Sequence, residues 1–249
     1  MTARRISNLA QLLQGLKEDV GSYNGSLWFR GHSNSSWQLL PGYLRLTDAP
    51  SEGTLLKRFK QSAALLVHRE PKDSYDWLFL MQHYGLPTRL LDWSESPLVA
   101  LYFAVNDALA DHEGDSALWV LKPSELNKEA HINDQSEEFF VPSFEDEELS
   151  NYKLETLAAG PKRTRLLPIA SIATRNNSRI QAQLGAFTIH HLDNIALEDV
   201  GSKTHVIKYE IPPSSRDVFR RELKLLGYSK FSLFPELSSI GENIRSTLR

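Results

Sequence analysis

Residues 82–105 read QHYGLPTRLLDWSESPLVALYFAV and contain a helix end, a short apolar run and a new helix start. Gly85 favours the left-handed backbone that closes a helix. Pro87 prevents that helix from continuing. Ser96-Pro97 is typical of an N-cap followed by the first helical position. We therefore expect residues 88–94 to connect a strand to a helix.

A strand-to-helix connection presents backbone N–H groups and fixed side chains to a ligand. The residues of this connection that we take as candidates for ligand binding are Thr88, Arg89, Asp92, Trp93 and Ser94. The alternative is structural: Arg89 and Asp92 would form an ion pair, and Trp93 would belong to the core.

Length and composition place the chain among ordinary globular domains. Its 249 residues are expected to form a single domain, residues 1–249, that begins with a helix within residues 1–22. A net charge of -3 gives no global attraction to nucleic acid or to an anionic membrane. The absence of cysteine excludes disulfides, thiolate catalysis and sulfur-based zinc sites. With no long apolar run, we expect a cytoplasmic protein without a membrane partner.

A second candidate lies where residues 26–29, an apolar strand pattern, meet Arg30, Gly31 and His32. Glycine permits close backbone approach. The planar guanidinium of arginine suits a phosphate or a carboxylate. A structural ion pair between Arg30 and a buried carboxylate such as Asp92 is the alternative.

Two helices are expected before the central stretch, one from Ser51 and one from about Asp73. The second delivers His83, which is a candidate general base or ligand-orienting group. A hydrogen-bonded structural histidine at a helix end is the alternative.

Residues 128–162 carry many acids, including Asp134 and Glu145, and predict a solvated insertion or lid. Their spacing lacks the pattern of a calcium loop, so we expect no metal. Further on, Arg175, Arg179 and Gln183 recur at helical spacing and could form an anion cradle. An exposed polar stripe is the alternative.

Four runs together resemble the FRG domain family, which takes its name from the motif seen here as Phe29-Arg30-Gly31. They are WFRGHSNSSWQLLPGYLR, MQHYGLPTRLLDWSESPLVALYFAV, SRIQAQLGAFTIH and SLFPEL, and they span roughly residues 26–240. The family occurs mostly in bacteria and phages, which implies a setting of bacterial or phage conflict.

At a second level, the chain resembles ADP-ribosyltransferases, which hold NAD between a strand ending in arginine and a strand carrying serine or threonine. The resemblance implies that Arg30 holds a phosphate or the nicotinamide amide, that Gly31 contacts this amide, and that His32 belongs to the same element. It further implies ribose contacts from His83, Asp92 and Ser94, and pyrophosphate contacts from Arg175 and Arg179. Gln183 stands where those enzymes carry a glutamate, so Gln183 or Glu236 would address the anomeric carbon.

The expected fold is α+β, a single compact domain with a small bent or split mixed sheet flanked by helices and resembling an ADP-ribosyltransferase core. The leading hypothesis is an NAD-like nucleotide-binding domain that transfers ADP-ribose to a protein or nucleic-acid acceptor, or cleaves NAD. The alternatives are a metal-independent ribonuclease built on Arg30, His83 and Arg89, and a non-catalytic nucleotide or partner sensor.

Overall fold

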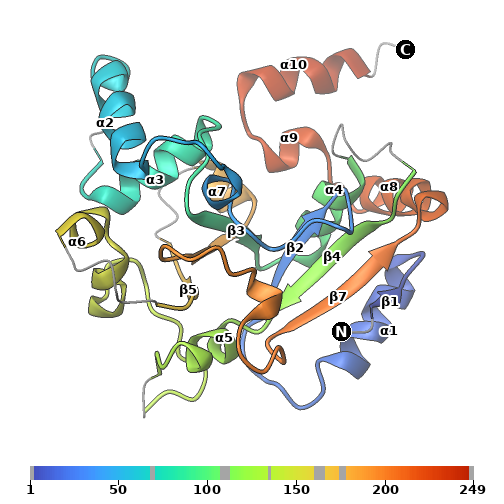
Figure 1. Cartoon of the computed structure of the whole chain (residues 1–249). Helices are drawn as coiled ribbons and strands as arrows, with labels where there is room; N and C mark the ends of the chain where they lie inside the picture. The colour runs from blue at the N-terminus through green and yellow to red at the C-terminus, as the bar shows by residue number, and fades with distance from the viewer. Residues whose placement is uncertain are drawn as a thin grey trace.

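The computed structural model describes residues 3–67, 71–106, 113–133, 136–159, 166–173 and 178–246. These residues form an α+β fold around a seven-stranded mixed sheet of order β1-β7-β4-β2-β3-β6-β5 (Figure 1). Only β1 and β7 run parallel among the described strands; the other neighbours are antiparallel. The strands are β1 (Arg4–Arg5), β2 (Trp28–His32), β3 (Leu90–Ser94), β4 (Ser116–Leu121), β5 (Ile169–Ser171), β6 (Gly185–Ile189) and β7 (Val206–Ile211).

The sheet is divided between β2 and β3, as the expectation of a split sheet required. One residue pair, Phe29 opposite Ser94, joins these two strands. In contrast, five pairs join β2 to β4, from Trp28 to His32, and five join β3 to β6. The sheet therefore consists of two parts, β1-β7-β4-β2 and β3-β6-β5, that separate beyond this single pair.

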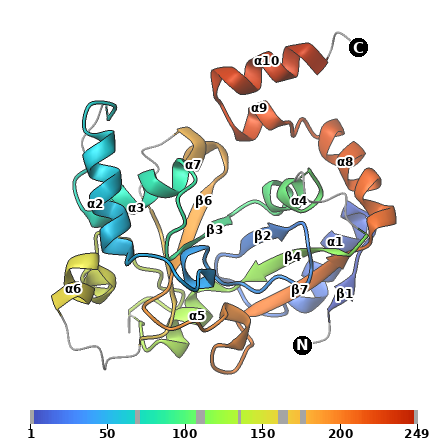
Figure 2. The same ribbon diagram turned by 45° about the horizontal axis from the view of Figure 1, so that its top comes forward.

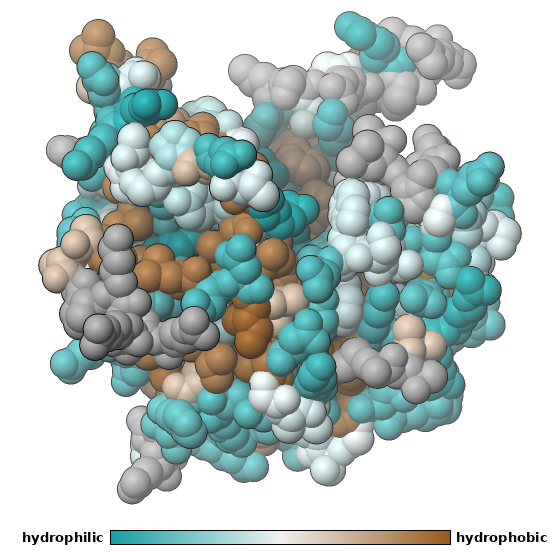
Figure 3. Space-filling view, in the orientation of Figure 1, coloured by the Kyte–Doolittle hydropathy of each residue, from teal (hydrophilic) through white to brown (hydrophobic). Residues whose placement is uncertain are grey.

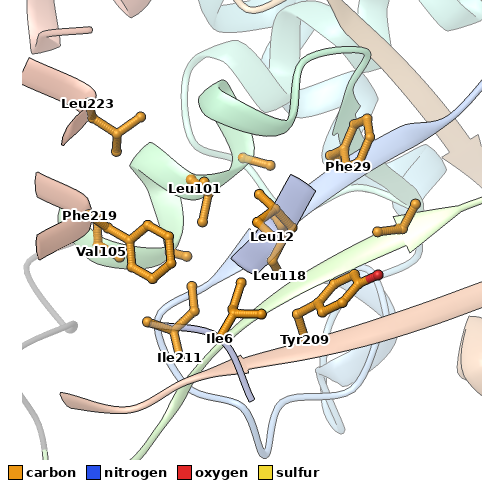
Figure 4. Close-up of a cluster of buried hydrophobic side chains, with 13 residues drawn as sticks. Ile6, Leu12, Phe29, Leu101, Val105, Leu118, Tyr209, Ile211, Phe219 and Leu223 are labelled. Atoms are coloured by element: carbon orange, nitrogen blue, oxygen red, sulfur yellow. The ribbon is translucent and has the colours of Figure 1, made fainter. Parts of the chain in front are cut away.

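Three helices cover one face of the first part: α1 (Leu9–Asp19), α4 (Pro97–Asn106) and α8 (Arg216–Leu225). Their apolar sides meet the strands in a buried cluster that includes Leu12, Leu101, Phe219 and Tyr209 (Figure 4). Helix α4 is the apolar helix expected after Ser96-Pro97, and it reaches the sheet beside the split.

The second part packs against α2 (Glu52–Ala63) and α3 (Ser74–His83) through another buried cluster, which includes Leu56, Leu78 and Phe187 (Figure 2). A third cluster on the opposite face draws residues from both parts of the sheet, among them Trp93 and Trp119. This shared cluster holds the two parts together where the strand ladder does not.

Helix starts follow the local sequence signals closely. Ser51 caps α2 and Asp73 caps α3, each accepting a hydrogen bond from a backbone N–H in the first turn. Gly85 takes a φ of 81° after α3, as expected for a helix-closing glycine. At the first helix the sequence favours Ser7 as the cap, and this expectation is wrong: Asn8 is the N-cap of α1, because its Oδ1 accepts from the Gln11 backbone N–H at 2.9 Å.

The acidic segment 128–162 differs from the expected mobile lid. Its acids from Glu145 to Glu148 are exposed, but Phe144, Leu149 and Tyr152 are buried in the core around α3. Residues 134–135, with Asp134 among them, and residues 160–162 lie outside the described residues. The rest of the segment is therefore a partly anchored edge of the core, in which acids alternate with buried aromatic and leucine side chains. It contains the end of α5 (Pro123–Glu129), a 3-10 helix (Glu147–Tyr152) and α6 (Leu154–Ala159).

The remaining described helices are short or C-terminal. They are three 3-10 turns (Tyr43–Arg45, Leu197–Asp199 and Pro213–Ser215), α7 (Ser178–Ala182), α9 (Lys230–Leu233) and α10 (Leu237–Ser246). Within the described ranges, no helix combines the length and apolarity needed to cross a bilayer.

One face of the molecule carries hydrophobic surface in its middle, bordered by hydrophilic residues (Figure 3).

Candidate functional site

A cavity of about 230 Å³ lies where β2 and β3 separate, beside the start of α4. Its walls come from both strands, from the segment that follows β2, from α4, and from the region of α7. The lining residues are Phe29, Arg30, Gly31, His32, Ser33, Trp37, Gln38, Leu40, Arg45, Asp92, Trp93, Ser94, Val99, Ala100, Phe103, Arg179 and Gln183. The two segments that the sequence singled out, residues 30–32 and 92–94, therefore share one cavity.

Arg30 bridges the gap between the separated strands. Its Nη1 donates to the backbone carbonyl of Asp92 at 2.5 Å, and its Nε donates to Nε2 of His32 at 3.0 Å. Burial lowers the pKa of Arg30, the Asp92 carboxylate opposes this, and Arg45 adds to the lowering. Arginine remains charged at neutral pH in proteins, so the cavity contains a fixed cation. The alternative, an ion pair between Arg30 and a buried Asp92 carboxylate, differs from the structure. Arg30 bonds to the backbone of Asp92, and the carboxylate is exposed and accepts from Gln82.

His32 is a neutral, buried neighbour of this cation. Burial, followed by the charge of Arg30, lowers its pKa to about 3, although the backbone of Trp37 acts in the opposite direction. Because Nε2 accepts from Arg30, the ring proton lies on Nδ1. The ring also packs edge-on against Trp37 at 6.0 Å between centroids. His32 thus orients Arg30 and adds no positive charge to the cavity.

Gly31 is required by helix packing. A Cβ at this position would lie 1.9 Å from the carbonyl oxygen of Ala100 and 2.6 Å from the backbone nitrogen of Ala104. The glycine thus allows α4 to lie directly on β2. Its backbone still lines the cavity, but the close approach that explains the glycine is an approach to the helix.

The cavity is strongly biased toward positive charge. Of the described residues, Arg30, Arg45 and Arg179 line it, together with the single carboxylate of Asp92. Arg45 is exposed, and it comes from the irregular segment between β2 and α2, where no pattern marked it as a site residue. Three guanidinium groups from three segments make the cavity suitable for an anion, above all a phosphate.

The Asp92 carboxylate is held by a chain of hydrogen bonds. Gln82 Nε2 donates to Asp92 Oδ1 at 2.6 Å, and the Thr88 hydroxyl donates to Gln82 Oε1. Thr88 Oγ1 in turn accepts from the Leu90 backbone N–H at 3.2 Å. Thr88 is buried and does not line the cavity, so its part is to position Gln82 and through it Asp92.

Arg89 is not a ligand-binding residue in this structure, which corrects the expectation from its place in the central stretch. Its side chain is 1% exposed, and its Nε forms a buried ion pair with Glu52 at 2.6 Å. Its two terminal nitrogens donate to backbone carbonyls of His190, His191 and Tyr152. The guanidinium of Arg89 therefore does not reach the cavity. The ribonuclease hypothesis, which needs Arg30, His83 and Arg89 around one phosphate, loses one of its three groups.

Trp93 and Ser94 contribute walls to the cavity, while their polar atoms bond to protein. Trp93 Nε1 donates to Thr188 Oγ1 at 3.1 Å, and the residue is 3% exposed. The Ser94 hydroxyl donates to the Gln183 carbonyl at 2.6 Å and accepts from the Ser96 N–H at 3.0 Å. The structural alternative for Trp93 is therefore correct, and Ser94 ties β3 to the end of α7.

The polar residues of α7 meet the C-terminal segment above the cavity. Arg179 lies over the ring of Phe234 at 4.7 Å, and Gln183 Nε2 donates to the Leu233 carbonyl at 3.1 Å. Phe103 of α4 contacts Phe234 edge-on, with centroids 5.8 Å apart. The third residue of this expected cradle, Arg175, lies outside the described residues. Arg179 and Gln183 do share one side of the site, as their spacing indicated.

His83 lines a second, smaller hollow of about 60 Å³. Burial and the charge of Arg179 lower its pKa, and Glu236 opposes this. Glu236 is exposed and lines neither hollow, and its charge acts on His83 through space. The second hollow is lined by Phe79, Gln82, His83, Asp92, Trp93, Arg179, Ile180, Gln183, Gly185 and Phe187.

Sequence reasoning did not name several residues of the site. They are Trp37, Arg45, Gln82 and Phe234. Each lies in one of the runs that resemble the FRG domain family, and that resemblance was the one signal that could have pointed to them. A search of the described ranges for three or more metal-ligating side chains in one place finds no such group.

Comparison with known proteins identifies part of the chain. Residues 25–113, about a third of it, match the FRG domain, and the chain therefore contains an FRG domain. The match includes Arg30 and the central stretch, while α7 and the C-terminal segment lie beyond it. No curated protein and no solved structure gives a significant match.

Proposed function

We propose that this chain uses the cavity, which lies between its FRG domain and the region of α7, to bind an NAD-like nucleotide. The observation that carries the proposal is the convergence of Arg30, Arg45 and Arg179 on a cavity whose described lining includes one carboxylate. The whole chain has a net charge of -3, so this positive charge is local and marks the place where an anion would be attracted. Arginine forks match the paired oxygens of phosphate groups.

The size and lining of the cavity favour one end of such a nucleotide. Pockets that enclose a drug-sized ligand measure about 300–1,000 Å³, and this cavity is smaller, at about 230 Å³. Trp37 and Phe103 supply aromatic surface for a flat ring. We place the nicotinamide and its ribose inside, with the phosphates at the exposed Arg45 and the adenosine outside the cavity.

The reaction that fits this placement is cleavage of the bond between nicotinamide and ribose. When this C–N bond breaks, its electron pair leaves with neutral nicotinamide and positive charge develops on the ribose. A carboxylate held nearby stabilises that charge. Asp92 is the carboxylate that lines the cavity, and Gln82 holds one of its oxygens at 2.6 Å. Asp92 therefore takes the role that the resemblance gave to Gln183 or Glu236, while Gln183 is hydrogen-bonded to Leu233.

The test combines binding with turnover. Purified protein is mixed with NAD, and thermal stabilisation and nicotinamide release are measured. Arg30→Ala should weaken NAD binding about 10- to 100-fold, the usual effect of losing a charged hydrogen-bonding group. Asp92→Asn should retain binding and lower nicotinamide release about 100- to 1,000-fold. Arg4→Ala, in the edge strand β1 and outside the cavity lining, is the matched control.

Two results would change the conclusion. Stabilisation by NAD without nicotinamide release would identify a nucleotide sensor. Absence of both stabilisation and release in the unaltered protein would reject the nucleotide proposal itself.

A further inference from the structure

The second hollow adjoins the cavity, and the two share part of their walls. Four residues line both: Asp92, Trp93, Arg179 and Gln183. The side chains found in the second hollow alone come from α3, from Ile180 in α7, and from β6. Among the described lining residues, Asp92 is thus the one carboxylate that faces both spaces.

The position of Asp92 between the two spaces is well defined. The hydrogen-bond chain from the Leu90 N–H through Thr88 and Gln82 ends on Asp92 Oδ1. Thr88 is 2% exposed, so the chain is anchored in the core. A group in either space would therefore meet a carboxylate whose orientation is set before binding.

The second hollow also contains a group able to accept a proton. His83 stands at the end of α3, half-buried, with its ring 4.9 Å from that of Tyr84. The charged groups that act on it are Arg179 from α7 and Glu236 from the segment before α10. Burial and the charge of Arg179 lower the pKa of His83 from its ordinary value of 6.5, so at pH 7 the imidazole is neutral and has a nitrogen lone pair that can accept a proton.

We propose that the second hollow is the subsite for the attacking hydroxyl group and that His83 accepts its proton. The inference rests on the proposed function, because it assigns the second reactant of that reaction. The hydroxyl oxygen approaches the ribose carbon from the second hollow while nicotinamide leaves on the cavity side. One C–O bond forms, the C–N bond breaks with its electron pair going to nicotinamide, and the hydroxyl proton moves to an imidazole nitrogen of His83.

Size limits the chemical class of the nucleophile. A cavity needs a volume of about 10–15 Å³ to hold one water molecule. The hollow, at about 60 Å³, therefore admits water or one small hydroxyl-bearing group, and it excludes a nicotinamide ring. The hydroxyl can come from free water or from the tip of a side chain on an acceptor.

The experiment measures which hydroxyl group accepts ADP-ribose when NAD is supplied in water alone, with methanol, or with a short serine-containing peptide. Products are separated as ADP-ribose, methyl-ADP-ribose and ADP-ribosylated peptide, which distinguishes the hydroxyl sources. His83→Asn should lower the formation of all three about 100- to 10,000-fold, with the dissociation constant of NAD unchanged. The unaltered protein should lose activity at acid pH as His83 is protonated, and this limb of the pH profile should vanish in His83→Asn. His131→Asn, which changes an exposed histidine outside both hollows, is the matched control.

A second variant tests the space independently of the base. Ile180 lines the second hollow and not the cavity, so Ile180→Phe should reduce the ratio of methyl-ADP-ribose to ADP-ribose while NAD still binds. Circular dichroism and thermal unfolding verify that each variant folds. If the unaltered protein releases nicotinamide and both variants match it in rate, product ratio and pH profile, the subsite assignment is wrong and the nucleotide proposal stands. If the unaltered protein neither binds nor cleaves NAD, the nucleotide proposal itself fails.

Discussion

Replacing Glu52 with glutamine should strongly destabilise the fold, because it leaves the buried guanidinium of Arg89 without its counter-charge. The Glu52 carboxylate accepts from the Arg89 backbone N–H at 2.8 Å and from its Nε at 2.6 Å. The two side chains are 3% and 1% exposed. Removal of one partner from a buried ion pair costs about 3–5 kcal/mol. For a chain of this length, that corresponds to a fall in Tm of about 6–20 °C.

The measurement is urea unfolding at pH 7, followed by circular dichroism, with a thermal scan alongside. Glu18→Gln is the control, because it removes the acid of an exposed ion pair with Arg4 and should leave the unfolding midpoint unchanged. Ligand affinity of the folded Glu52→Gln protein should equal that of the unaltered chain, because Arg89 does not line the cavity. An unfolding free energy within about 1 kcal/mol of the unaltered protein, or a selective loss of ligand binding, would refute the structural role of this pair.

Three further predictions concern packing, charge and pH. Gly31→Ala should destabilise the protein, because the added Cβ would lie 1.9 Å from the Ala100 carbonyl oxygen. An unchanged midpoint of urea unfolding would show that α4 does not pack on β2 as described. Arg45→Ala should weaken the binding of a nucleotide and make that binding less sensitive to added salt. Titration calorimetry at two salt concentrations measures both effects. A salt dependence equal to that of the unaltered protein would show that Arg45 does not contact the nucleotide. Burial lowers the pKa of both His32 and His190 to about 3, below the ordinary value of 6.5, so the unfolded chain binds more protons between these limits. Stability should therefore fall as the pH drops from about 6.5 toward 3, by about 1.4 kcal/mol per pH unit for each histidine, and a free energy of unfolding that stays constant between pH 7 and 5 would contradict their burial.

The parts of the fold that local sequence could predict are those with local causes. Ser51 and Asp73 cap helices through bonds to their own first turns, and Gly85 ends α3 through its own backbone. The run into Arg30 and the run into Asp92 were each recognisable as strands. That they adjoin each other in the sheet and share a cavity followed from the resemblance, and from no local pattern.

The site could not be predicted where partners are distant in sequence. Asp92 was the expected partner for Arg89 because it lies nearby, whereas the actual partner, Glu52, comes from a helix 37 residues earlier. Arg45 lines the cavity because the turn that ends with it packs beside β3, where the Tyr43 backbone N–H donates to the Thr88 carbonyl. The buried residues of the acidic segment were hidden in the same way, since its many acids outweighed Phe144 and Tyr152 in the overall composition.

The single ladder pair between β2 and β3 has a consequence for how the width of the cleft is determined. In a continuous sheet, backbone hydrogen bonds hold neighbouring strands about 4.8 Å apart whatever their side chains are. Beyond Phe29 and Ser94 that constraint is absent, and the spacing depends on the reach of Arg30 to the Asp92 carbonyl and on the seating of α4 against Gly31. Side chains therefore determine how wide the cleft is. Single substitutions at these contacts could adapt it, during evolution, to ligands of different size without altering either part of the sheet.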